Sequence, residues 1–144
     1  MATLIARIIQ NLLYESAYSY LKDVILLKKR HIMKNKLLIV WSSQDIEVAN
    51  KLVLLYSSVI LPRAYWDEAI LMVWGPSAKL LSENEALQHK VQEIAKTGVK
   101  LQACVVCTND YGISDKIASL GVELTHTGEM LTHALQNDWK VITF

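Results

Sequence analysis

Two cysteines, Cys104 and Cys107, are the residues of this 144-residue sequence whose type and spacing best suit chemistry. They follow the apolar, alternating segment Val99 to Cys104, which predicts a buried strand. Three residues typical of helix N-caps come next, namely Thr108, Asn109 and Asp110. Helical spacing over Tyr111 to Leu120 then predicts a helix. The pair is therefore expected where a strand ends and a helix begins, which is where open α/β sheets place ligands and reactive groups.

A thiol in that position meets the positive end of a helix dipole and free backbone N–H groups, and both favour the thiolate. The Cys-x-x-Cys pair fits a dithiol redox centre, half of a zinc site, or a nucleophilic, sulfur-carrying thiolate. It also fits a small apolar side chain that merely fills the turn. A zinc site needs two further ligands, and the histidines are scattered: His31, His89, His126 and His133. We therefore predict no metal, and no cofactor because the sequence has no glycine-rich phosphate loop.

Several turns should share the sheet edge with Cys104, because the carboxyl ends of parallel strands meet there. These turns are Ser42-Ser43, Trp74 and Thr125-His126. His126 can hydrogen-bond the Cys104 thiolate or simply cap a turn. Tyr111 is interpreted as a pocket wall or a subunit contact. The candidate binding residues are Ser43, Trp74, Asn109, Tyr111 and His126.

Apolar runs separated by helical patterns predict five strands in the main part of the chain. Their expected ranges are Leu37–Trp41, Glu68–Trp74, Val99–Cys104, Gly121–Thr125 and Trp139–Phe144. Helices are expected between them, near residues 45–61, 78–81, 82–96, 111–120 and 127–137. This alternation predicts a three-layer α/β/α fold with a five-stranded, mainly parallel sheet.

Two of these helices carry more detailed expectations. In the helix over 45–61, an apolar stripe is predicted to face inward, and it consists of Val48, Leu52, Leu55 and Val59. Ser82 and Glu85 have the spacing of a capping box at the start of the next long helix, whose inward face is Leu87, Val91 and Ile94.

The first part of the chain, residues 1–34, is interpreted as an amphipathic helical extension of an α/β domain over 35–144. Apolar pairs recur every four positions over residues 4–25, and the basic run Lys28 to His31 follows. Such a helix packs on its own domain or on a neighbouring subunit, or it contacts a membrane surface, which we consider the less favoured reading. Met33, just before the first strand, is an alternative start of translation.

The charge distribution argues against a nucleic-acid partner. Residues 1–36 carry seven Lys and Arg against two acidic residues, a net charge of +5, whereas residues 37–144 carry eight against twelve, a net charge of −4. The main domain therefore lacks a basic face. No signal peptide or membrane-spanning run is recognised, so a cytoplasmic, reducing compartment is expected, in which close cysteines are reactive more often than structural.

Several short segments carry a resemblance to a known family. They are Leu37 to Ser42, the turn at Trp74-Gly75, Val99 to Cys104, Tyr111-Gly112-Ile113, Leu120-Gly121-Val122 and Trp139 to Phe144. Over residues 35–144 the sequence resembles the DsrE/DsrF-like family of small sulfur-relay proteins. Asn137-Asp138 departs from the pattern, since many relatives carry glycine before the last strand, and this departure affects the turn.

The resemblance implies a three-layer domain that assembles as trimers or hexamers. It also implies that Cys104 accepts sulfane sulfur as a persulfide from a protein donor and passes it to a protein acceptor. Cys107 occurs in only some branches, where it either resolves the persulfide as a disulfide or merely packs. Our first hypothesis is thus a cytoplasmic, homo-oligomeric sulfur carrier that needs no cofactor. The alternatives are an oligomeric interaction module with incidental thiols and a Cys-x-x-Cys redox sensor.

Overall fold

The computed structural model describes residues 2–32 and 35–144, with side chains described over 4–26 and 35–144. The chain divides into two units, Met1–Lys34 and Asn35–Phe144, and each is described by itself. Met33, the alternative start, lies outside the described residues, and so do the side chains of the basic run Lys28 to His31.

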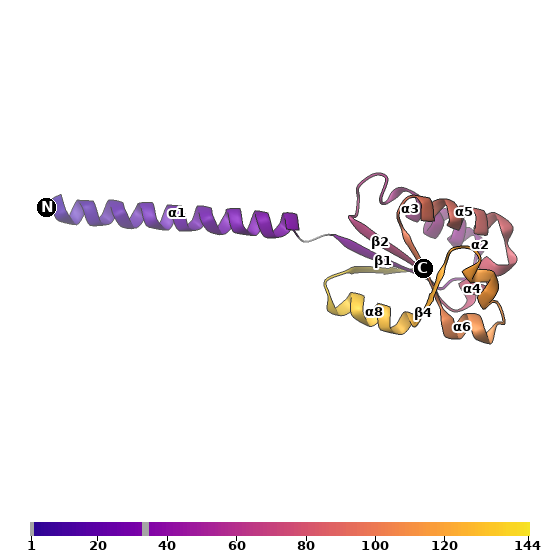
Figure 1. Cartoon of the computed structure of the whole chain (residues 1–144). Helices are drawn as coiled ribbons and strands as arrows, with labels where there is room; N and C mark the ends of the chain where they lie inside the picture. Colours follow the sequence, from indigo (N-terminus) through magenta and orange to yellow (C-terminus); the bar gives the residue numbers. More distant parts are fainter. Residues whose placement is uncertain (1, 33–34) are drawn as a thin grey trace. The chain divides into compact units, whose positions relative to one another are not determined.

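The larger unit is built on a five-stranded sheet (Figure 1). Its strands are β1 (Lys36–Trp41), β2 (Glu68–Val73), β3 (Lys100–Cys104), β4 (Glu123–Thr125) and β5 (Lys140–Thr143). They lie in the order β4-β3-β2-β1-β5, and every pairing between described strands is parallel. The predicted five-stranded sheet is confirmed. β1 begins one residue before its predicted range, at Lys36, and each of the other four strands is one or two residues shorter than its predicted range at one end or at both.

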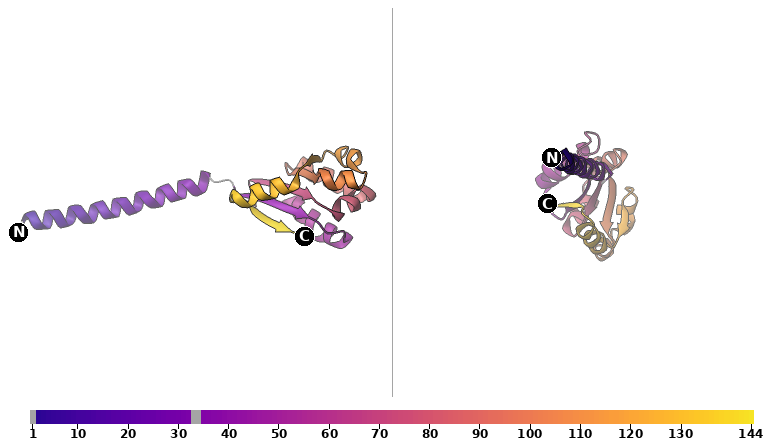
Figure 2. Two further views of the ribbon diagram at one scale, coloured as in Figure 1. Left: turned by 90° about the horizontal axis from the view of Figure 1, so that it is seen from below. Right: turned by 90° about the vertical axis from the view of Figure 1, so that its left-hand side faces the viewer.

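Helices cover both faces of this sheet, as Figures 1 and 2 show. On one face, alternate strand residues such as Ile39 and Leu71 form the larger apolar cluster with α2 (Ile46–Val48), η1 (Ala49–Val53), α3 (Leu54–Val59), α4 (Pro76–Glu83), α5 (Glu85–Lys96) and α7 (Ser114–Ala118). On the other face, Leu38, Ile70 and Met72 pack with α8 (Thr127–Gln136). The three-layer α/β/α prediction is therefore confirmed.

The inward face predicted for residues 45–61 is wrong at Leu52 and Leu55, whereas Val48 does pack against the larger cluster. Asp45 caps the helix, and its side chain accepts the N–H groups of Glu47 and Val48. However, Leu52 and Leu55 are 48% and 59% exposed, and the buried residues are Ala49, Val53, Leu54, Ser57 and Ile60. Two apolar stripes run side by side along this segment. The wider π turn of η1 brings Val53 and Leu54 inward together, so the second stripe faces the core.

The capping box predicted at Ser82 is also wrong, because Ser82 still belongs to α4 and its hydroxyl donates to the carbonyl of Lys79. Asn84 caps α5 instead, and its side-chain oxygen accepts the N–H of Leu87 at 3.0 Å. Asp138 precedes β5 with φ +58°, in the left-handed region that glycine adopts at least cost. Asp138, at the position where many relatives carry glycine, is therefore held with backbone strain that glycine would avoid.

The smaller unit is the single helix α1 (Ala2–Ile32), in agreement with the predicted N-terminal helix. Its described apolar side chains, including Leu12 and Leu13, are all exposed. Within the described residues, no helix is both long enough and apolar enough to span a bilayer.

Candidate functional site

Cys104 is the last residue of β3 and at the same time the N-cap of α6 (Val105–Asp110). Its backbone is extended, with φ −67° and ψ 112°, and its Sγ accepts the N–H of Cys107 at 3.5 Å. The thiol thus takes the place that a serine hydroxyl or aspartate carboxylate usually fills at a helix start. The strand-to-helix junction was predicted, and the structure places the sulfur at that junction.

The helix after the pair was predicted in the wrong place. Thr108, Asn109 and Asp110 lie inside α6 and do not cap it. The predicted single helix over 111–120 is broken, because Gly112 adopts φ +66° between α6 and α7. α6 begins earlier than expected. Its first turn was not predicted because cysteine is not among the preferred capping residues.

Hydrogen bonds favour the charged form of Cys104. Burial raises the pKa of this thiol, but the nearby Thr127 hydroxyl, which can donate to a charged sulfur, the N–H and thiol of Cys107 and the N–H of Val106 together outweigh the burial. The pKa of Cys104 therefore lies below its ordinary value. This sulfur is the more acidic of the two, and its lowered pKa favours the thiolate that nucleophilic chemistry needs.

Cys107 has the opposite character. Its side chain is half-buried, and both burial and the hydrogen bond to Cys104 raise its pKa. An N–H bond from Gly75 acts in the other direction without reversing the shift. Gly75 has φ +66° and ψ −132°, a conformation that only glycine adopts at low cost. In this turn after β2, its backbone N–H contacts the Cys107 sulfur. At neutral pH, Cys107 therefore stays protonated and donates to its neighbour.

Three buried polar atoms on the same side of the sheet as Cys104 lack hydrogen-bond partners among the described residues: Gln102 Oε1, Thr125 Oγ1 and Thr127 Oγ1. Thr125 pairs in register with Cys104, and Gln102 lies two residues before it on β3. Thr127, at the start of α8, is 1% exposed. Its hydroxyl proton is therefore free to be donated to the sulfur once the sulfur is charged. The sequence offered only one signal for this residue, its position next to the predicted turn at His126.

The other predicted binding residues are more dispersed. Trp74 belongs to the turn whose Gly75 reaches Cys107, whereas Ser43 lies beyond β1, with β2 between it and β3. The side chain of Asn109 accepts a hydrogen bond from Ser114 at 2.6 Å, which ties α6 to α7. Tyr111, just after α6, is exposed. His126 is the N-cap of α8 but makes no capping bond with its side chain.

A family model describes most of the chain. The model of the DsrE/DsrF-like family matches residues 42–144. The chain belongs to the DsrE/DsrF-like family. No curated protein sequence matches it.

Two solved structures are similar to this chain. A protein of unknown function from Bacteroides thetaiotaomicron is 25% identical and has a TM-score of 0.74, with 76% of this chain and 95% of that chain covered. The ychN protein from E. coli is 20% identical and has a TM-score of 0.56, with 78% and 100% covered. At that identity, the likeness to the second structure shows the fold alone.

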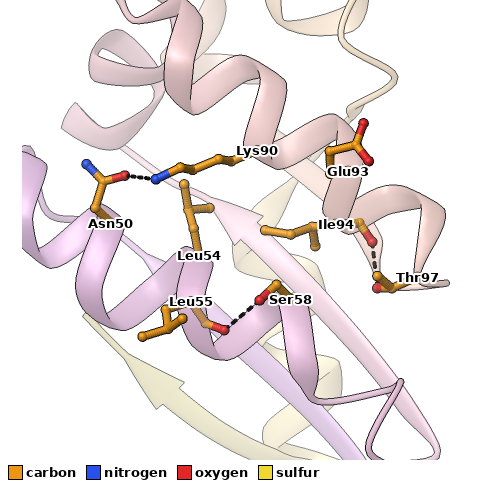
Figure 3. Close-up of a pocket in the computed structure, with 8 residues that line it drawn as sticks. All are labelled: Asn50, Leu54, Leu55, Ser58, Lys90, Glu93, Ile94 and Thr97. Atoms are coloured by element: carbon orange, nitrogen blue, oxygen red, sulfur yellow. Dashed lines mark hydrogen bonds between the residues drawn. The ribbon is translucent and has the colours of Figure 1, made fainter.

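Away from the cysteines, this DsrE/DsrF-like domain has an open hollow of about 400 Å³ between α3 and α5 (Figure 3). Leu54 and Ile94 form its floor, and Lys90 Nζ donates to Asn50 Oδ1 at 2.6 Å across it. The hollow contains neither thiol. In the described part of the chain, His, Cys, Asp and Glu side chains do not gather in threes as metal ligands do. The two cysteines and the hydroxyls beside them are therefore the chemically distinctive site.

Proposed function

We propose that this protein is a sulfur carrier in which Cys104 holds sulfane sulfur as a persulfide. The observation that carries the proposal is the position of Cys104 at a strand-to-helix junction, where N–H and hydroxyl donors lower its pKa. Membership of the DsrE/DsrF-like family supports it. The donors that favour a thiolate also favour a persulfide anion, because both carry a negative charge on sulfur.

Loading is a single displacement. The Cys104 thiolate attacks the sulfane sulfur of a donor, a sulfur–sulfur bond forms, and the remainder of the donor leaves with the electron pair of the broken bond. With thiosulfate as the donor, the leaving group is sulfite and the product is the Cys104 persulfide anion. No cofactor takes part in this step. Return of the sulfur to an acceptor thiol is the same displacement with the roles exchanged.

Mass measurement after exposure to thiosulfate or inorganic polysulfide tests the proposal. The full-length protein is expected to gain the mass of one sulfur atom, and Cys104→Ser is expected to gain none. Cys107→Ser is the matched control, because it retains the proposed loading cysteine. The proposal fails if the wild-type protein takes up no sulfur or if Cys104→Ser takes up as much as the wild type.

We further propose that the carrier works in a reducing compartment such as the cytoplasm, between a protein donor and a protein acceptor, as a homo-oligomer of three or six chains. The exposed apolar side chains of α1 support self-association over a free monomer. Light scattering of the full-length protein tests the assembly. A monomer that co-sediments with liposomes would overturn the assembly proposal in favour of membrane contact.

A second candidate function is a dithiol redox switch, because the thiols of Cys104 and Cys107 contact each other and differ in acidity. It predicts a reversible Cys104–Cys107 disulfide, detected as the loss of two hydrogen masses at a cellular glutathione ratio. Sulfur uptake without disulfide formation under the same conditions would exclude the switch.

A further inference from the structure

The two cysteines of the site differ in exposure. Cys104 is 6% exposed, whereas Cys107 is half-buried. Val106, which precedes Cys107 in the first turn of α6, is 53% exposed, so this turn lies at the surface. A thiol displaces sulfur by approaching its target sulfur directly, opposite the bond that breaks. An acceptor thiol from another protein therefore meets Cys107 more readily than a persulfide held on Cys104.

The two cysteines also lie close enough for a direct exchange. They occupy the first turn of α6, and the N–H of Cys107 is 3.5 Å from Cys104 Sγ. Residues three apart on a helix have Cβ atoms roughly 5–6 Å apart, and a sulfur–sulfur bond is about 2 Å long. A sulfur atom added to Cys104 therefore covers much of the separation between the two side chains.

We propose that the sulfur moves within the chain, from the buried Cys104 to the more accessible Cys107, before an acceptor takes it. This inference rests on the proposed function, because it needs a persulfide on Cys104. Cys104 thus acts as the loading cysteine and Cys107 as the unloading cysteine.

Atoms and charges balance in this step. The Cys107 thiol first gives its proton to the outer sulfur of the Cys104 persulfide anion. The Cys107 thiolate then attacks that outer sulfur, a new sulfur–sulfur bond forms at Cys107, and the bond to Cys104 breaks. Cys104 leaves as a thiolate with the electron pair. No external oxidant or reductant is consumed, and the products are a Cys107 persulfide and the original Cys104 thiolate.

The surroundings favour this direction of transfer. The less acidic thiol is the stronger nucleophile once deprotonated, and the more acidic one is the better leaving group. The departing Cys104 thiolate regains the N–H of Cys107, and the Thr127 hydroxyl is free to donate to it. On the other side, the N–H of Gly75 is directed at the Cys107 sulfur.

Attack on the inner sulfur is the competing reaction. It would release sulfide and leave a Cys104–Cys107 disulfide, and it would convert the carrier into a sulfide-releasing protein. The two reactions have different products, so one experiment separates them.

The test follows the position of one sulfur atom over time. The full-length protein is loaded with thiosulfate, alkylated with iodoacetamide at intervals, digested, and fragmented to locate the extra sulfur. The extra sulfur is expected on Cys104 first and on Cys107 later. Cys107→Ser, whose hydroxyl still provides a donor beside Cys104, is expected to take up sulfur but to pass it to glutathione at least about tenfold more slowly, because the in-chain step is lost.

Three outcomes would overturn the inference: sulfur that stays on Cys104 in the wild type, equal transfer to glutathione by Cys107→Ser, or one equivalent of sulfide with a disulfide. In the first two cases Cys104 still holds the sulfur, so the proposed function survives, whereas release of sulfide with a disulfide would overturn the carrier function as well. Absence of any uptake by the wild type would overturn both. A thermal melt of Cys107→Ser that matches the wild type shows that the variant folds.

Discussion

The two faces of the sheet bury different kinds of residue. One face buries a large apolar cluster between β1, β2 and β3 and the helices α2 to α5 and α7. The other has a smaller apolar cluster under α8, and beside it lie Cys104 and the unpartnered polar atoms of Gln102, Thr125 and Thr127. Buried polar atoms without partners cost stability. The first face therefore supplies stability, and the second carries two threonine hydroxyls, those of Thr125 and Thr127, that can donate to a charged sulfur.

Replacement of Cys104 should separate sulfur chemistry from stability most strongly. Cys104→Ser is expected to abolish sulfur uptake while changing the free energy of unfolding by less than about 1 kcal/mol, because Cys104 belongs to neither apolar cluster and serine is a good N-cap. Uptake by mass and unfolding by urea are the two measurements. A loss of several kcal/mol would mean that the thiol is mainly structural, which would undo the contrast between the faces.

Truncation on the apolar face should have the reverse effect. Leu54→Ala is expected to lower the free energy of unfolding by about 2–5 kcal/mol, since Leu54 is buried in the larger cluster. Its neighbour Leu55 is the matched control, and Leu55→Ala is expected to change that free energy by roughly 0.5 kcal/mol or less. Equal costs for the two variants would contradict the register that η1 imposes on this segment.

A smaller effect is expected from the buried hydroxyl at the start of α8. Thr127→Val removes a donor to the thiolate, so it should raise the pKa of Cys104 and slow sulfur uptake several-fold at neutral pH. The free energy of unfolding should stay level or rise slightly, because an unpartnered buried hydroxyl is replaced by a methyl group.

Thr132→Val is the control for Thr127→Val, because Thr132 lies on the same helix, is exposed and bonds only the carbonyl of Gly128. It is expected to leave uptake and its pH dependence unchanged. An equal slowing in both variants would show that the effect comes from α8 as a whole and not from the Thr127 hydroxyl.

The sequence was sufficient to predict the sheet and the place of the thiol, because β1 and β2 are nearly continuous apolar runs, β3 alternates, and both cysteines lie at the end of β3 or just after it. It was insufficient for the first turn of α6, where a cysteine caps the helix. It was also insufficient at Leu52 and Leu55, since periodicity does not choose between two adjacent apolar stripes.

Thr127 was missed for a different reason. Its importance depends on the packing of α8 against β3, which brings residues far apart in sequence together. Local pattern shows only that a threonine begins a helix. Gly75 is similar, because its N–H meets Cys107 only once β2 and β3 are paired.

The central claim is that Cys104, although more buried, is the more acidic thiol of the pair. Site-resolved alkylation of the wild-type protein across a pH series tests it most directly, because the midpoint of each rate curve reports the pKa of that thiol, independent of how accessible the thiol is. The account predicts a midpoint for Cys104 below the ordinary thiol value and a midpoint for Cys107 above it. Coinciding midpoints, or a higher midpoint for Cys104, would contradict it.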